Sequence, residues 1–217
     1  MDSKELIARR VAREIRPGSL VNLGIGLPSM VANFVPSSAG VFFQAENGVI
    51  GLGARPPEGM EDRHLTDAGG GFVTAVPGAA SIDSAMSFGL IRGGHLDMTV
   101  LGGLQVDEAG HLANWKVPGK MVPGMGGAMD LVTGAARVVV AMQHAARGES
   151  KIVPELTLPM TAMRRVDLVV TDLAVIEPMK EGLFLRERAP GVSVDTIVAA
   201  TAARLVIPDH VPEMILA

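Results

Sequence analysis

The sequence predicts an α/β protein with a mixed sheet, formed by a single domain over residues 1–217. Short apolar runs alternate along the chain with stretches in which apolar residues recur at helical spacing. The chain is 48% hydrophobic and 19% charged, so it can bury a sizeable core. It shows no internal repeat, linker or break in composition, which predicts one domain.

The first part of the chain begins with a helical pattern. Apolar residues recur at helical spacing over 3–16, and a Pro-Gly pair follows, which predicts a helix that ends there. Residues 19–24 and 40–46 are predicted to be short strands. Between them we expect a glycine turn that leads into a helix with Pro28 near its first position. Residues 53–71 have the composition of a loop.

The second part alternates in the same way. Two runs, 97–106 and 111–115, flank a turn and predict a hairpin. Two β-branched runs, 137–144 and 166–176, are typical of strands buried on both faces. Helices are predicted over 81–94, at the end of the Pro- and Gly-rich segment 116–132, and over 193–201.

Composition excludes several kinds of function. The chain has no Cys, which excludes disulfides, thiolate catalysis and Cys-based metal sites. Its net charge of −4, the absence of Tyr and the single Trp argue against a nucleic-acid partner. No apolar stretch approaches the ~20 residues of a membrane helix. The amphipathic start lacks the apolar core of a signal peptide, so we expect a cytoplasmic protein with no membrane partner.

The first candidate site is the turn from Gly24 to Ser29. A strand followed by glycines and a helix start suits an anion or a ligand that lies close to the backbone. Gly24 and Gly26 match a dinucleotide fingerprint, and Glu46 lies at the distance of its acidic residue. The third glycine is replaced by Ser29, and Pro28 removes an amide from the turn. A tight turn without any ligand remains an alternative.

The second candidate is Glu46, the one charged residue in "FQAENGVIGLG". A carboxylate on a surface turn is the simplest interpretation, because Asn47 and Gly48 form a common turn pair. A metal site is not expected, since no His or acidic cluster accompanies Glu46. A nucleophile that attacks an activated acyl carbon fits the setting better than a metal ligand does, and the surface turn stays an equal alternative. The glycines that follow would let a bulky substrate approach.

The third candidate is the stretch from Gly124 to Asp130. Consecutive glycines at a helix start, here Gly126 and Gly127, can present backbone amides to an oxyanion. Small residues placed for packing would give the same pattern. Lys116 and Lys120 lie just upstream and could meet phosphates or form a solvated rim.

Together these blocks resemble a known family. "VNLGIGLPSMVANFV", "QAENGVIGLG", "GGHLDMTVLGGLQVDEAGHLANW" and "VPGKMVPGMGGAMDLVTGA" match, in order, the β subunit of family I CoA-transferases of the 3-oxoacid type. The resemblance covers nearly the whole chain. It is closest to the β subunits of bacterial acetate/acetoacetate CoA-transferases, followed by the 3-oxoadipate and succinyl-CoA:3-oxoacid enzymes.

The resemblance implies a fold and a set of site residues. The fold is an open α/β sheet with helices on both faces, similar to that of sugar-phosphate isomerases. Glu46 takes the place of the nucleophile, and Ala45 stands where the family usually has Ser. Gly126 and Gly127 match the glycine loop near the acyl oxygen. Further residues assigned to the oxyanion or to CoA are Asn47, Gly48, Gly24 and Gly26.

The resemblance also implies a reaction and a partner. The reaction is ping-pong transfer of CoA between carboxylic acids through a glutamyl-CoA thioester, with CoA as cosubstrate and no metal or other cofactor. The partner is an α subunit, and the expected assembly is α2β2. A mean hydropathy of +0.34 fits a chain with such an interface. An acyl-CoA hydrolase and a dinucleotide-binding subunit remain the alternatives.

Overall fold

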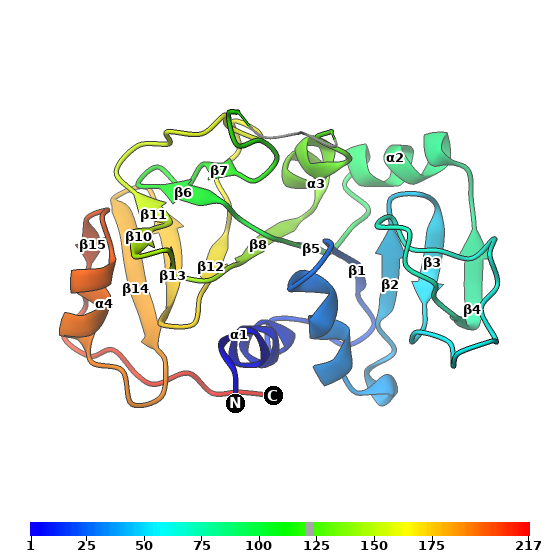
Figure 1. Ribbon diagram of the computed structural model, residues 1–217, viewed down its shortest axis with the longest axis horizontal. Coiled ribbons are helices and arrows are strands. Elements are labelled where there is room, and N and C mark those ends of the chain that lie inside the picture. The colour runs from blue at the N-terminus through cyan, green and yellow to red at the C-terminus, as the bar shows by residue number, and fades with distance from the viewer. Residues whose placement is uncertain (120–123) are drawn as a thin grey trace.

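The computed structural model describes residues 1–119 and 124–217. In these residues one ten-stranded sheet runs from β15 at one end of the molecule to β4 at the other (Figure 1). The strands lie in the order β15-β14-β13-β12-β8-β5-β1-β2-β3-β4, beside a smaller sheet β11-β6-β7 and the hairpin β9-β10. Their bounds are β1 Leu20–Leu23, β2 Phe42–Ala45, β3 Val49–Leu52, β4 Ala75–Ser81, β5 Met98–Leu101, β6 Gln105–Asp107, β7 Leu112–Ala113, β8 Arg137–Ala141, β9 Ala145–Ala146, β10 Glu149–Ser150, β11 Ile152–Val153, β12 Leu168–Val170, β13 Ala174–Met179, β14 Gly182–Arg188 and β15 Leu205–Val206.

Helices cover both faces of this sheet. Asp2, Asp83 and Ser193 cap α1, α2 and α4 by accepting a hydrogen bond from the amide three residues further on. In the described part of the chain, no helix has the length and apolar character needed to cross a bilayer. The α-helices are α1 Ser3–Ala12, α2 Ser84–Arg92, α3 Ala128–Gly134 and α4 Val194–Ala200, and the 3₁₀ helices are η1 Pro28–Phe34 and η2 Ser37–Ala39.

The middle strands β12, β8, β5, β1 and β2 all run parallel. Antiparallel strands flank them, β3 and β4 on one side and β13 and β14 on the other. The chain passes from β1 through η1 to β2, and later reaches β5 on the other side of β1 through α2. The strand order therefore reverses at β1. In open α/β sheets, ligands bind beyond the carboxyl ends of the strands at such a point.

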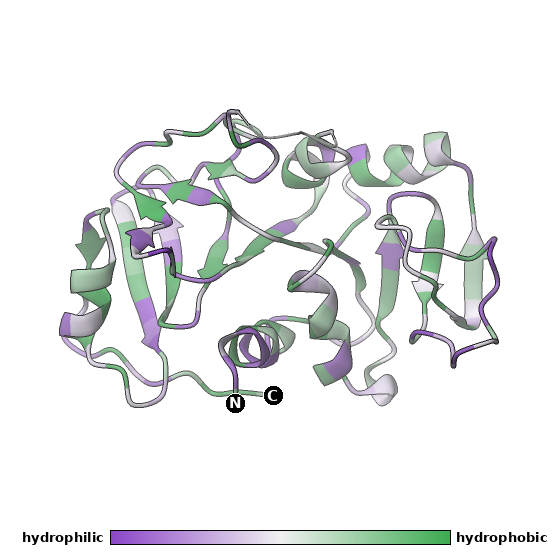
Figure 2. Cartoon of the chain, viewed as in Figure 1, coloured by the Kyte–Doolittle hydropathy of each residue, from purple (hydrophilic) through white to green (hydrophobic). Residues whose placement is uncertain are grey.

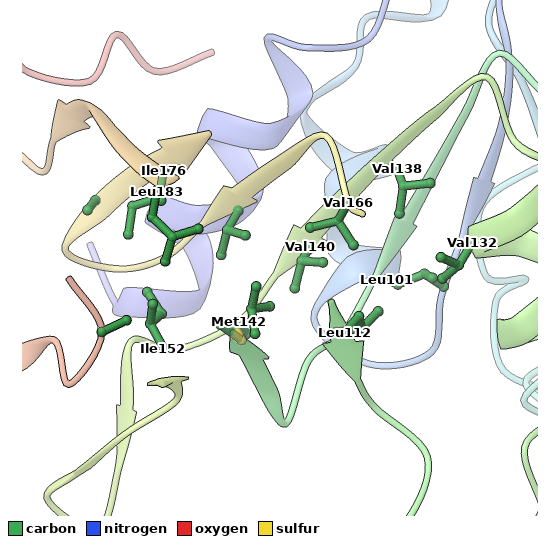
Figure 3. Packing of buried hydrophobic residues seen from close by; sticks show 14 of the residues in the cluster. Leu101, Leu112, Val132, Val138, Val140, Met142, Ile152, Val166, Ile176 and Leu183 are labelled. Carbon is green, nitrogen blue, oxygen red and sulfur yellow. The ribbon is translucent and has the colours of Figure 1, made fainter. Parts of the chain in front are cut away.

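Two apolar cores lie on the two faces of the sheet. The first contains Leu112, Val140 and Ile152 and packs α2, α3, α4 and the smaller sheet against the large one (Figure 3). The second packs α1 and η1 on the opposite face through residues such as Ile7 and Val31. Figure 2 shows that the middle strands are mostly hydrophobic, whereas the connection between β3 and β4 is mostly hydrophilic. The predicted α/β class, with an open mixed sheet and helices on both faces, is confirmed.

Two predicted strands are each divided by a turn. The run 97–106 breaks at Gly103, so that β5 stays in the large sheet while β6 pairs with β7 in the smaller one. A side chain on Gly103 would meet Met142 Sδ at 2.7 Å, so the chain passes close to the core there. The run 166–176 breaks at Thr171, whose hydroxyl accepts hydrogen bonds from the amides of the residues two and three positions further on.

The segment after the glycine turn forms the 3₁₀ helix η1, which begins at Pro28, so the predicted helix is present. The strands that were not predicted are β3, β4, β9, β10, β11, β14 and β15. β4 contains Pro77 and Gly78, residues that argue against a strand unless it lies at the edge of a sheet, as β4 does.

Candidate active site

Glu46 lies at the carboxyl end of β2, in the loop of the β2-β3 hairpin. The pairing of Ala45 with Val49 leaves a three-residue loop, and the Gly48 amide donates to the Ala45 carbonyl at 3.0 Å. Gly48 has φ +119°, and a Cβ there would lie 2.0 Å from the Ile82 carbonyl oxygen. Glycine is therefore required at position 48 both by the backbone of the loop and by the close approach of the chain at Ile82.

The Glu46 side chain is half-buried between two elements. Its Oε2 accepts a hydrogen bond from Asn22 Nδ2 on β1 at 3.2 Å. A Cβ added to Gly127, the residue before α3, would lie 3.3 Å from Glu46 Cγ and 3.4 Å from the Phe88 ring. The structure thus brings together two sequence blocks that are separated by some eighty residues, with Gly126 (φ +58°) next to Gly127.

A row of buried polar side chains lies beneath Glu46, and the sequence interpretation missed it. Asn22, Gln44 and Thr99 are each 0% exposed, and they lie on the neighbouring strands β1, β2 and β5. Ser87 of α2, also fully buried, accepts a hydrogen bond from Gln44 at 2.9 Å. A signal was present, because each of these three apolar strands carries one uncharged polar residue at an interior position.

The hydrogen bonds of the described residues do not join the other predicted residues to the Glu46 carboxylate. Asn47 Nδ2 donates to the Thr66 carbonyl at 2.8 Å, which ties the hairpin loop to the long β3-β4 connection. The Gly24 amide donates to the Val100 carbonyl at 2.8 Å, so it is already engaged within the sheet. Gly26 is exposed and has φ +83°.

A cavity of about 1110 Å³ lies on the face of the sheet that η1 covers. Its lining includes Gly24, Gly26 and Ala45, together with the glycine-rich stretch 69–71. The cavity reaches Ala45, the residue before Glu46. Ala45 and Gln44 are successive residues of β2 and point to opposite faces of the sheet, so the cavity lies on the face opposite to Gln44.

The lysines upstream of the glycine stretch are placed only in part. Lys116 Nζ lies 5.7 Å from the centre of the Trp115 ring. Lys120 lies outside the described residues. Among the described residues, no group of three or more His, Asp or Glu side chains has the arrangement of a metal site.

Comparison with known proteins decides the family. The family model described as coenzyme A transferase matches residues 4–200. The chain belongs to the coenzyme A transferase family. It is 55% identical over 205 residues to the beta chain of the acetate CoA-transferase of Escherichia coli K12, covering 94% of each chain. It is 49% identical over 201 residues to the equivalent subunit of the Helicobacter pylori (strain 26695) succinyl-CoA:3-ketoacid coenzyme A transferase, covering 92% of this chain and 97% of that one.

The fold of this CoA-transferase subunit also matches solved structures of the family. The acyl-CoA transferase YdiF apoenzyme of Escherichia coli O157:H7 superposes with a TM-score of 0.80 at 25% identity. The match covers 99% of this chain and 43% of the YdiF chain. The subunit thus corresponds to a little under half of that longer polypeptide.

Proposed function

We propose that this CoA-transferase subunit carries the covalent intermediate of the reaction on Glu46. The observation that supports this proposal is the position of one carboxylate. Glu46 follows the carboxyl end of a central strand and is half-exposed. It lies between the Asn22 amide and the glycines that precede α3. A carboxylate held beside hydrogen-bond donors can act as a nucleophile toward an acyl carbon.

The proposed reaction has two steps, which the acceptor acid then reverses. A carboxylate oxygen of Glu46 attacks the thioester carbonyl carbon, the C–S bond breaks, and CoA leaves as the thiolate to give a mixed anhydride. The thiolate attacks the Glu46 carbonyl carbon and the anhydride C–O bond breaks. The donor acid leaves as a carboxylate, and a glutamyl-CoA thioester remains. No proton and no electron is gained or lost overall.

The glycines around Glu46 have distinct tasks in this proposal. Gly126 and Gly127 present backbone amides to the oxygen that becomes negative in the tetrahedral states, where one such donor contributes ~3 kcal/mol. Gly48 and Asn47 hold the hairpin loop. Gly24 and Gly26 line the cavity that also reaches Ala45, the residue before Glu46. Both glycines are assigned to contact with CoA.

We further propose that the subunit acts together with an α subunit in the cytoplasm, in an α2β2 assembly. Two observations support a partner: the similar proteins named above are subunits, and YdiF is more than twice as long as the matched region. One of the two relatives is named for acetate and the other for succinyl-CoA and a 3-ketoacid, so acetate and 3-oxoacids are the candidate acids.

The decisive experiment is Glu46→Gln in the assembled enzyme. This substitution keeps the shape of the side chain and removes the nucleophile, so CoA exchange between acetyl-CoA or succinyl-CoA and an acceptor acid should be lost while assembly with the α subunit persists. Glu46→Asp withdraws the carboxylate by about one bond and should cost ~100-fold in rate. Near wild-type turnover of Glu46→Gln would refute the proposal.

A covalent readout separates transfer from hydrolysis. After incubation with acyl-CoA and borohydride, peptide mass spectrometry should find the modification on Glu46 in the wild type and none in Glu46→Gln. CoA release that needs an acceptor acid identifies a transferase, whereas release at the same rate without any acid identifies a hydrolase.

A further inference from the structure

The polar row beneath Glu46 is unusual for the middle of a sheet. Asn22 pairs in register with Gln44 on one side and with Thr99 on the other, so the three side chains lie next to one another on one face. The next positions of the same row are apolar, Ile50 beyond Gln44 and Val138 beyond Thr99. Burial of polar groups is costly unless each is hydrogen-bonded. Among the described residues, every buried side-chain nitrogen and oxygen has a partner.

The hydrogen bonds of the row fix which way the Asn22 amide points. Thr99 Oγ1 donates to Asn22 Oδ1 at 3.1 Å, so the oxygen of this amide faces β5 and its nitrogen faces β2. Nδ2 then lies 3.0 Å from Gln44 Oε1 and 3.2 Å from Glu46 Oε2. A reversed amide would set an oxygen lone pair against both of these acceptors.

Gln44 is held in turn by α2. Its Nε2 donates to Ser87 Oγ at 2.9 Å, so its Oε1 must face Asn22. A hydroxyl can donate or accept, so the orientation is set by two groups that only accept: the Gln44 backbone carbonyl, 3.2 Å from Asn22 Nδ2, and the Glu46 carboxylate. The hydroxyls of Thr99 and Ser87 complete the arrangement by bonding Asn22 Oδ1 and Gln44 Nε2. A fully satisfied polar network of this kind specifies one arrangement of its members.

We propose that Asn22 is a catalytic hydrogen-bond donor to Glu46 Oε2, and that Thr99, Gln44 and Ser87 are positioning residues that hold its amide in that orientation. The proposal rests on Glu46 being the nucleophile. With Oε2 held by Asn22, the other oxygen, Oε1, is left to attack the acyl carbon. When the CoA thiolate then attacks the Glu46 carbonyl carbon, negative charge develops on Oε2, and the Asn22 N–H group already points at it.

The donor and the network are tested separately, in the enzyme assembled with its α subunit. Asn22→Ala removes the donor and should lower kcat by ~100-fold or more. Thr99→Val keeps the side-chain shape but removes the hydroxyl that orients Asn22. It should slow the single-turnover formation of the glutamyl-CoA thioester by about tenfold, with KM for acyl-CoA unchanged. Thr99→Ser keeps the hydroxyl and should recover most of that loss.

Two further variants separate positioning from general loss of structure. Ser87→Ala introduces a strong helix former into α2 and removes only the acceptor of the Gln44 amide, so it should fold and slow the same step several-fold. Val100→Ala lies on the same strand as Thr99 but contributes to the core on the opposite face, so it should lower Tm without slowing the chemistry.

Intact-protein mass spectrometry, followed over time, measures how fast the thioester forms. It separates a failure of Glu46 as the nucleophile from a failure of Asn22 as its hydrogen-bond donor. If the wild type forms no adduct at Glu46, the nucleophile assignment fails. If the wild type forms the adduct, three results would overturn the inference: Thr99→Val and Ser87→Ala both at the wild-type rate, Thr99→Ser as slow as Thr99→Val, or Asn22→Ala with an unchanged rate.

Discussion

The close contact of the glycine stretch with Glu46 makes Gly127→Ala an informative substitution. The new Cβ would lie 3.3 Å from Glu46 Cγ, whereas carbon atoms prefer separations of ~3.5–4.0 Å. The new Cβ would also lie 3.4 Å from the Phe88 ring, so it would be in close contact on two sides. Glu46 would have to move by about 0.5 Å. Since a misplacement of 1 Å costs ~100-fold, kcat should fall by about tenfold.

The assay is CoA exchange by the assembled enzyme, with Tm measured in parallel. Gly127 has φ −83°, which suits Ala, so backbone strain is not expected. Ala is, however, a poorer residue than Gly at the start of a helix. Gly127→Ser controls for this effect, because Ser is a good cap but carries the same Cβ. We expect Gly127→Ser to be slow as well. If it regains the wild-type rate, or if Gly127→Ala never loses it, the contact with Glu46 does not matter.

Three other substitutions or conditions test parts of the fold. Gly48→Ala combines φ +119° with a Cβ only 2.0 Å from a carbonyl oxygen, so it should cost ~3 kcal/mol or more in the free energy of unfolding. A loss below ~1 kcal/mol in denaturant titration would contradict the loop geometry. Gly89→Ala, in α2 with open space around it, should gain ~0.5–1 kcal/mol, and a lower Tm would be the wrong sign. Burial lowers the pKa of His144, against the opposing charge of Asp172, so the unfolded chain binds the proton more readily and stability should fall as pH drops below ~6.5. Below pH ~6.5 the Tm of His144→Gln should depend less on pH than that of the wild type, and equal slopes in this range would rule His144 out as the cause.

The sequence predicts the centre of the site because the relevant residues stand out locally. Glu46 is the single charge in an apolar and glycine-rich block, and Gly127 belongs to a glycine run before a helix. The local pattern does not show how close Glu46 and Gly127 lie in the folded protein. The contact between Glu46 and Gly127 depends on how α3 packs over the sheet, and only the resemblance to a family placed the two blocks in one site.

The polar row was missed for a different reason. Asn22, Gln44 and Thr99 are far apart in sequence, and each alone is one polar residue in an apolar strand. They become a network only through the register of β1 with its two neighbours. Parallel strands are joined by long crossover connections and not by a tight turn, so no short motif in the sequence shows their register.

The missed strand boundaries share a cause as well. Apolar β-branched runs predict a strand but do not say where it ends. At Thr171 a single hydroxyl turns the chain, and at Gly103 close packing against Met142 diverts it into another sheet. Thr171 bonds amides within its own run, whereas the break at Gly103 depends on packing against Met142, which lies outside its run.

The register also resolves the question raised by Ala45, which stands where the family usually has Ser. Ala45 and Gln44 are adjacent on β2 and point to opposite faces. Gln44 belongs to the polar row that reaches Glu46 through Asn22, whereas Ala45 lines the cavity on the η1 side together with Gly24. A hydroxyl on residue 45 would therefore face the cavity and not the hydrogen bond that holds the carboxylate. The hydrogen bond from Asn22 to Glu46 therefore does not depend on a hydroxyl at position 45. Ala45 in place of Ser changes the lining of the cavity, and with it the contacts of a ligand bound there.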